Sequence, residues 1–230
     1  MIRENLLDVE DRIQAACDRA GRDRNEVTLI AVSKTKPISM IEEVMEEGII
    51  DFGENKVQEL CEKEETIKEP LNWHLIGHLQ RNKVKYIIDK ACLIHSVDSL
   101  RLAEQISEEA KKKNTTANIL IEVNIANEET KFGVSKEETL PLILEISKLP
   151  NIRIKGLMTI APFVEDPEDN RVHFSNLRNL LVDIKSKNID NIDMDILSMG
   201  MTGDFEIAIE EGATMVRVGT GIFGQRNYNI

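Results

Sequence analysis

VTLIAVSKTKP, residues 27–37, indicates which of two parallel-sheet folds this chain adopts, an open doubly wound sheet or a closed barrel. Its first seven residues, 27–33, are mostly apolar and rich in β-branched side chains, which indicates a buried β-strand. An open doubly wound sheet usually carries a G-x-G-x-x-G turn after its first strand. This strand is followed instead by Lys34, Thr35, Lys36 and Pro37, without a glycine. The stretch therefore favours a closed barrel over the open sheet.

The same alternation of an apolar run and a helical pattern continues along the chain. Further strand-like runs lie at residues 49–54, 72–77, 92–97, 117–125, 152–160, 194–200 and 214–219. Together with the first, they make eight strand–helix units. Eight alternating units predict a parallel sheet that closes into a (β/α)₈ TIM barrel.

The helical segments carry their own start and stop signals. Residues 2–20 have apolar side chains at helical spacing and end near Gly21, which predicts an extra amphipathic helix before the first strand. We expect residues 1–230 to form one barrel domain, with residues 1–21 packed on it. Two capping boxes are expected to open later helices, formed by Ser39 with Glu42 and by Ser135 with Glu138.

Composition excludes several classes of protein. The chain has 230 residues with 41 acidic and 29 basic side chains, a formal charge of −12, and 4% aromatic residues. This balance argues against nucleic-acid binding, which relies on lysine, arginine and aromatic stacking. Three scattered cysteines give no disulfide or zinc framework. Without an apolar leader or a run long enough to span a membrane, we expect a cytoplasmic protein with no membrane association.

The loops after the seventh and eighth strands have the composition of a phosphate site. They read SMGMTGD at residues 198–204 and GTGIFG at residues 219–224. Phosphate commonly binds at these two loops in TIM barrels. Glycines let backbone N–H groups approach an anion closely, and hydroxyl side chains add donors. Ordinary strand–helix turns are the alternative for either loop alone, but their joint occurrence favours phosphate.

A lysine at the end of the first strand extends this site. Barrel closure brings the first strand beside the eighth, so Lys34 becomes a neighbour of the loop that starts at Gly219. A partly desolvated lysine next to a phosphate site is suited to a Schiff base with an aldehyde. Pyridoxal 5'-phosphate carries both groups. Lys36 lies on the same face and is the rival, but Lys34 directly follows the strand and is preferred.

Arg217 lies inside the eighth strand, two residues before Gly219. An arginine that faces a barrel interior is costly unless it meets a partner. The ring nitrogen of the cofactor and a carboxylate such as Glu122 are the two candidate partners, and the sequence does not choose between them. At the ring nitrogen, an arginine would keep that atom unprotonated and weaken the electron sink needed for carbanion chemistry.

These residues belong to a recognisable series of motifs. The series comprises AVSKTKP (31–37), FGEN (52–55), WHLIG (73–77), LQ (79–80), NK (82–83), GLM (156–158), LSMGM (197–201), VRVGT (216–220) and IFG (222–224). It resembles the pyridoxal phosphate homeostasis proteins, also called the YggS/PROSC family, over essentially the whole chain. The resemblance implies a barrel like the N-terminal domain of alanine racemase, of fold type III.

The resemblance also implies roles for individual residues. Lys34 matches the cofactor lysine of the family, Asn55 would lie near the cofactor ring, and Arg217 would face the pyridine nitrogen. Ser198, Gly219 and Thr220 would hold the phosphate. Two departures from the family pattern are Thr202, where serine is frequent, and His78, which adds a possible titrating group near the site.

An amino-acid racemase is the alternative function. Two-base racemisation needs an acid or base on each face of the substrate, and Lys34 serves one face. Alanine racemases take the other base from a tyrosine of a second domain, whereas this chain has only Tyr86 and Tyr228. His74 or His78 would be unusual substitutes, and His74 fits a buried structural role better.

The favoured function is therefore non-catalytic. We expect a carrier or regulator in vitamin B6 homeostasis that holds the cofactor on Lys34, acts as a monomer, and buffers it or delivers it to apo-forms of pyridoxal phosphate-dependent enzymes. A scaffold that has lost ligand binding is disfavoured by its intact site residues. Lys131 is either a second aldehyde-reactive lysine or, in the preferred interpretation, a solvated loop residue.

Overall fold

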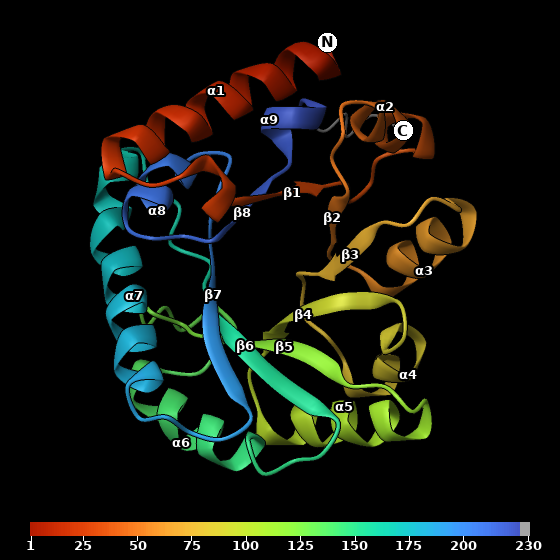
Figure 1. The fold of residues 1–230 in the computed structure, drawn as a ribbon, viewed down its shortest axis with the longest axis vertical. Helices are drawn as coiled ribbons and strands as arrows, with labels where there is room; N and C mark the ends of the chain where they lie inside the picture. Colours follow the sequence, from red (N-terminus) through yellow and green to blue (C-terminus); the bar gives the residue numbers. More distant parts are fainter. Residues whose placement is uncertain (226–230) are drawn as a thin grey trace.

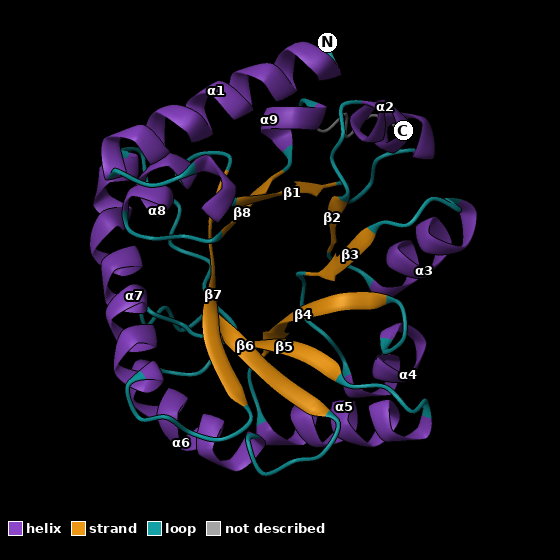
Figure 2. Cartoon of the chain, in the orientation of Figure 1, coloured by secondary structure: helices purple, strands orange, loops and turns teal. Residues whose placement is uncertain are grey.

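The structure, a computed structural model, describes residues 1–225 and contains a closed parallel barrel (Figures 1 and 2). Its strands pair in chain order from β1 to β8, and β8 closes onto β1 with Ala31 opposite Val218. The strands are β1 Thr28–Val32, β2 Asp51–Glu54, β3 Asn72–Leu75, β4 Ala91–Val97, β5 Ala117–Glu122, β6 Ile152–Met158, β7 Ile192–Met201 and β8 Met215–Val218. The predicted fold class is confirmed.

The helices surround the barrel (Figure 2). They are α1 Ile2–Ala20, α2 Ile38–Glu46, α3 Val57–Thr66, α4 Val84–Ile87, α5 Leu100–Lys112, α6 Lys136–Ile146, α7 Arg171–Lys185, α8 Phe205–Glu210 and α9 Thr220–Phe223. Short 3₁₀ turns at Arg24–Glu26, Arg81–Lys83 and Pro167–Asn170 precede β1, α4 and α7. Within residues 1–225, no helix combines the length and the apolar composition that crossing a membrane requires.

Helix α1 has the predicted bounds and lies across α8 and α9 (Figure 1). It ends at Gly21, whose φ of 65° lies in the left-handed region that glycine tolerates best. Its buried face carries Ile2, Leu6, Val9, Ile13, Ala16 and Cys17. Arg12 of this helix donates to Glu206 of α8 at 2.8 Å. The amphipathic pattern therefore covers the part of the barrel where the chain passes from β7 to β8.

One predicted capping box is confirmed and one is wrong. At α6, the Ser135 hydroxyl accepts from the Glu138 N–H at 3.2 Å, and the Glu138 carboxylate accepts from the Ser135 N–H at 3.3 Å. At α2, the helix already begins at Ile38, with Pro37 at the N-cap position. Pro37 holds an extended backbone with φ −70°, so the first helical turn starts early and Ser39 lies inside it.

The barrel interior is divided between apolar and polar side chains. Leu93, Leu120 and Met158 form a small apolar cluster, packed against Ile196 and Met215. Strands β3, β4, β7 and β8 instead contribute His74, His95, Ser198 and Arg217, which are all buried. Buried polar groups are costly unless they are hydrogen-bonded. The hydrogen-bond partners of these four side chains are therefore described with the site below.

Candidate functional site

A cavity of about 370 Å³ lies where β1, β2, β7 and β8 end. It is lined by Val32, Lys34, Asn55, Ile76, Ile160, Met201, Thr202, Gly203, Arg217, Gly219 and Thr220. The structure thus brings together all but one of the residues expected to bind the cofactor, at the barrel end where TIM-barrel sites occur. The exception is Ser198.

The two rival lysines have different surroundings. Lys34 is half-buried and lines the cavity. Lys36 turns toward the end of α9, where its Nζ donates to the carbonyl oxygens of Phe223 at 3.1 Å and Gly224 at 3.4 Å. The turn between them explains the divergence, because Thr35 has a φ of 62° and breaks the strand alternation. Position within the turn separates two lysines that strand periodicity places on one face.

A buried network, here called the lysine network, supports the turn that carries Lys34. Lys63 of α3 donates to the Ser33 carbonyl at 2.8 Å and to Glu54 Oε1 at 2.7 Å. The Ser33 hydroxyl donates to the same carboxylate oxygen at 2.6 Å. The Thr35 N–H donates to Glu59 Oε2 at 2.7 Å. Both neighbours of Lys34 are therefore anchored to side chains of β2 and α3.

The lysine network places two carboxylates, Glu54 and Glu59, around the single ammonium of Lys63. Burial raises the pKa of Glu54, and the adjacent Lys63 ammonium opposes that rise. Glu54 Oε2 is buried and has no hydrogen-bond partner among the described residues. Partial burial acts on Glu59 as well, but the hydrogen bond from Thr35 and the Lys63 charge hold its pKa below the ordinary value. Lys63 is thus the cation on which both carboxylates depend.

Arg217 reaches the cavity from inside β8. Its Nη1 donates to Ser198 Oγ at 2.5 Å and its Nη2 to the Thr159 carbonyl at 2.8 Å. The described ion pairs do not include a contact with Glu122, so the alternative partner proposed from the sequence is not in direct contact. Burial lowers the pKa of Arg217 to about 10, which leaves the guanidinium charged at neutral pH. Five N–H donors on one guanidinium leave donors for the cavity beyond these two bonds.

Ser198 does not line the cavity. It is fully buried, and its hydroxyl contacts Arg217 Nη1 and, at 2.9 Å, His95 Nδ1. The physical reason is that β7 continues to Met201, which places Ser198 within the strand and not in the loop after it. Thr202 and Gly203 line the cavity in its place. Thr202 was noted in the sequence as a departure, whereas Gly203 was seen only as part of its loop.

Asn55 directly follows β2, and its side-chain amide is not fully hydrogen-bonded. Its Oδ1 is buried without a hydrogen-bond partner in the part of the chain that the structure describes. The loop after β3 presses against it, and a Cβ at Gly77 would lie 2.3 Å from the Asn55 carbonyl oxygen. Only glycine permits this approach. Asn55 is consequently held beside the cavity with an unused acceptor.

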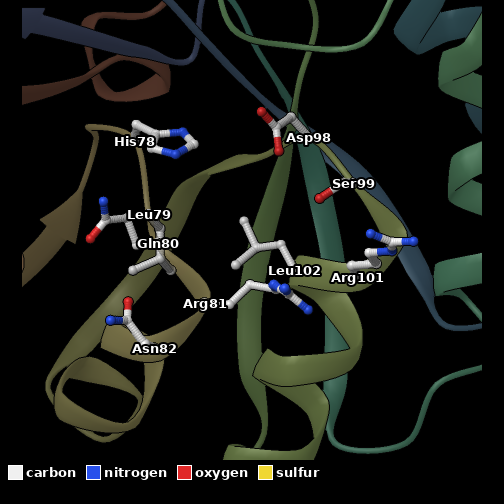
Figure 3. A pocket seen from close by; sticks show the side chains of 9 residues that line it. All are labelled: His78, Leu79, Gln80, Arg81, Asn82, Asp98, Ser99, Arg101 and Leu102. Atoms are coloured by element: carbon white, nitrogen blue, oxygen red, sulfur yellow. The ribbon is translucent and has the colours of Figure 1, made fainter.

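Other residues singled out in the sequence lie away from the cavity. His78 stacks on Phe132 with ring centroids 4.2 Å apart, and it lines a second cavity of about 540 Å³ between residues 78–82 and 98–102 (Figure 3). Lys131 does not line the first cavity but lines an adjoining one of about 190 Å³, which shares Ile160, Met201 and Gly203 with it. Tyr86 lies on α4 and is 47% exposed. Tyr228 lies outside the described residues.

Known proteins resemble this chain over nearly its full length. Residues 5–227 match the family described as alanine racemase, N-terminal domain. The pyridoxal phosphate homeostasis protein of Aquifex aeolicus is 48% identical over 226 residues, 98% of each chain. That of Pseudomonas aeruginosa is 41% identical over 228 residues, 99% of this chain and 96% of its own. The structure of PipY from Synechococcus elongatus with PLP bound superposes with a TM-score of 0.84 at 32% identity, covering 97% of this chain and 100% of PipY.

Proposed function

This chain belongs to the family of pyridoxal phosphate homeostasis proteins, and we propose that it holds pyridoxal 5'-phosphate as a Schiff base on Lys34 and buffers or delivers it. The observation that carries the proposal is the convergence of Lys34, Arg217 and two glycine- and hydroxyl-bearing loops on one cavity. The similarity to PipY, a protein solved with this cofactor, supports the choice of ligand. The cofactor supplies an aldehyde that condenses with amines.

The donors around the cavity fit the parts of this cofactor. Backbone N–H groups and hydroxyls near Thr202, Gly203, Gly219 and Thr220 suit a phosphate. A Cβ built at Gly203 meets nothing within 4 Å, so the backbone there is open to a ligand. The unpartnered Asn55 Oδ1 suits a donor near the ring. Ser198, expected to hold the phosphate, is reassigned in this proposal to the support of Arg217.

Two features of the cavity favour a carrier over a racemase. Among the described residues that line it, Lys34 and Arg217 are the ones that ionise in solution. Arg217 stays charged at neutral pH. A charged guanidinium only donates hydrogen bonds, so it cannot act as a general base. A second acid or base for two-base proton transfer is therefore lacking in this lining. A cationic donor at the ring nitrogen also disfavours its protonation, which weakens the electron sink.

The carrier role implies local binding of an anion by an acidic protein. The net charge of −12 opposes long-range attraction of a phosphate ester. Retention then depends on Lys34, Arg217 and the loop N–H groups, whose contacts are short-range. We propose apo-forms of pyridoxal phosphate-dependent enzymes as the recipients.

Borohydride reduction of the loaded protein, followed by peptide mass spectrometry, tests the attachment. We expect a pyridoxyl adduct on the peptide that contains Lys34, and we expect Lys34→Ala to lose it. Lys36→Ala is the matched control, since its ammonium contacts carbonyls at the end of α9. An adduct confined to any other lysine would refute the assignment.

Transfer to a purified apo-enzyme tests the role. Activation is followed in the presence of a trap for free cofactor, which separates direct delivery from release into solution. A panel of amino acids is assayed for racemisation in parallel. Turnover at ordinary enzymatic rates that disappears in Lys34→Ala would establish the racemase alternative instead.

A further inference from the structure

A chain of hydrogen bonds, here called the histidine chain, runs from Arg217 through the barrel to the start of β2. Ser198 Oγ lies 2.5 Å from Arg217 Nη1 and 2.9 Å from His95 Nδ1. His95 Nε2 lies 3.0 Å from His74 Nδ1. His74 Nε2 lies 3.0 Å from Asp51 Oδ1. Both imidazoles, the hydroxyl and the guanidinium are buried, and the Asp51 side chain is 20% exposed.

With both imidazoles neutral, the acceptor at the far end fixes the direction of every bond in this chain. The Asp51 carboxylate only accepts, so His74 donates from Nε2 and its Nδ1 accepts from His95 Nε2–H. His95 Nδ1 is then an acceptor, so the Ser198 hydroxyl donates to it and accepts from Arg217 with a lone pair. One arrangement of protons satisfies all four contacts, with both imidazoles neutral.

The surroundings of His95 support a neutral ring. Burial, His74 and the Arg217 charge together hold the pKa of His95 well below its ordinary value. His74 Nε2 also lies 3.6 Å from Cys92 Sγ. Burial raises the pKa of that thiol to about 12, so it is protonated and does not displace Asp51 as the acceptor.

We propose that Asp51, His74 and His95 are positioning residues for Arg217, acting through the hydroxyl of Ser198. The inference rests on the proposed function, because Arg217 is taken to face the cofactor ring. His95 holds the Ser198 hydroxyl so that a lone pair points at Arg217 Nη1. The guanidinium is thereby fixed between Ser198 and the Thr159 carbonyl, with its remaining donors directed to the cavity. Asp51 selects the histidine tautomers that allow this.

The alternative is that these polar groups only fill the barrel. Filling requires only volume and satisfied hydrogen bonds, and it predicts no effect on the cofactor. A positioning role instead predicts that removing a distant acceptor changes the environment of the cofactor ring. The half-buried Asp51 is the best place to test this, because its substitution leaves the centre of the barrel packed.

The first measurement uses the protein without cofactor. Nitrogen-15 chemical shifts of the histidine rings report which ring nitrogen carries the proton. We expect the Nε2–H tautomer for both His74 and His95 at pH 8. A Nδ1–H tautomer or a charged ring at His95 would overturn the proposal.

The second measurement uses the absorption spectrum and dissociation constant of bound cofactor. Asp51→Ala is expected to shift the spectrum and weaken binding about threefold, and His95→Leu about tenfold. Asp51→Asn keeps an acceptor for His74 and should restore wild-type values. Asp195→Ala, an exposed aspartate on β7 that pairs with Lys185, is the matched control.

Thermal unfolding of the cofactor-free variants checks that each is folded. Spectra and affinities of Asp51→Ala equal to those of the wild type would overturn the positioning role, even if stability fell. Absence of cofactor binding in the wild type is a different result. It would refute the proposed function and remove this role with it, while the tautomers stay measurable.

Discussion

The lysine network beside Lys34 and the histidine chain beside Arg217 each support one residue of the candidate site, but with different chemistry. The first consists of charged groups between β1, β2 and α3, centred on the contact of Lys63 with Glu54. The second crosses the barrel interior through neutral imidazoles and a hydroxyl. Removing one partner of a buried charged pair strongly destabilises the fold, because the other charge is left without compensation. A neutral chain orients its target without placing an extra charge beside a cofactor ring.

The largest effect is expected from breaking the charged network. Lys63→Met leaves the Glu54 carboxylate buried without its cation, which should lower the free energy of unfolding by about 3–5 kcal/mol. Chemical denaturation at pH 7 measures this. Lys56→Met, at an exposed lysine before the same helix, should change stability little. Equal losses in the two variants would contradict the central role of Lys63.

Glu122 is a buried carboxyl near Arg217, and it tests how a negative charge is tolerated close to the histidine chain. Burial and Asp98 raise the pKa of Glu122 from the ordinary 4.5 to about 7, against the opposing charge of Arg217. The stabilisation from this group is thus present below pH 4.5 and is lost as the pH rises through 7. Glu122→Gln should therefore raise the free energy of unfolding by about 3 kcal/mol at pH 8, and change it little at pH 4.

Denaturation curves of Glu122→Gln at several pH values between 4 and 8 measure this difference. Glu129→Gln, at an exposed glutamate of the following loop, serves as the control. A Glu122→Gln variant whose stability follows that of the wild type in parallel across the whole range would show that this carboxyl titrates normally.

Ser198→Ala interrupts the histidine chain at a fully buried hydroxyl. Arg217 loses an acceptor and His95 loses a donor, which should cost about 1–3 kcal/mol of stability. This is smaller than the loss at Lys63 because no full charge is left without its counter-ion. Chemical denaturation beside Ser186→Ala, an exposed serine at the end of α7, measures the difference. A loss as large as that of Lys63→Met would erase the distinction between the two networks.

The smallest effect is expected at Lys36. Lys36→Met removes the hydrogen bonds to Phe223 and Gly224 and should cost about 1 kcal/mol, while the borohydride-trapped adduct persists. Lys34→Met should instead lose the adduct. Loss of the adduct in both variants would mean that the turn itself, and not Lys34 alone, is required for attachment.

Much of the fold follows from local patterns in the chain. Alternating apolar runs placed all eight strands, and the break near Gly21 placed the end of α1. Boundaries were less accurate: the run at 117–125 extends past β5, which ends at Glu122. Ser39 was assigned to a cap because its spacing to Glu42 is right, although the backbone of Pro37 starts α2 earlier.

The candidate site was readable in part for the same reason. Lys34, Gly219 and Thr220 follow strand ends, and barrel closure makes strand ends neighbours, so their meeting in one cavity was foreseeable. Ser198 was counted both in the strand-like run 194–200 and in the phosphate loop 198–204, and the structure places it inside β7. His74 was recognised as buried, but its partners His95 and Asp51 were not.

Periodicity and the types of residue at strand ends act over a few neighbouring positions. The sequence alone therefore predicts the order of the elements, the barrel and the place of Lys34 after the first strand. Hydrogen-bond partners across the barrel depend on strand register and on which side chains closure brings within 3 Å. The contacts of Lys63 with Ser33, and of His95 with Ser198, join residues 30 and 103 positions apart. The folded barrel alone creates these contacts, and with them the two networks that hold Lys34 and Arg217.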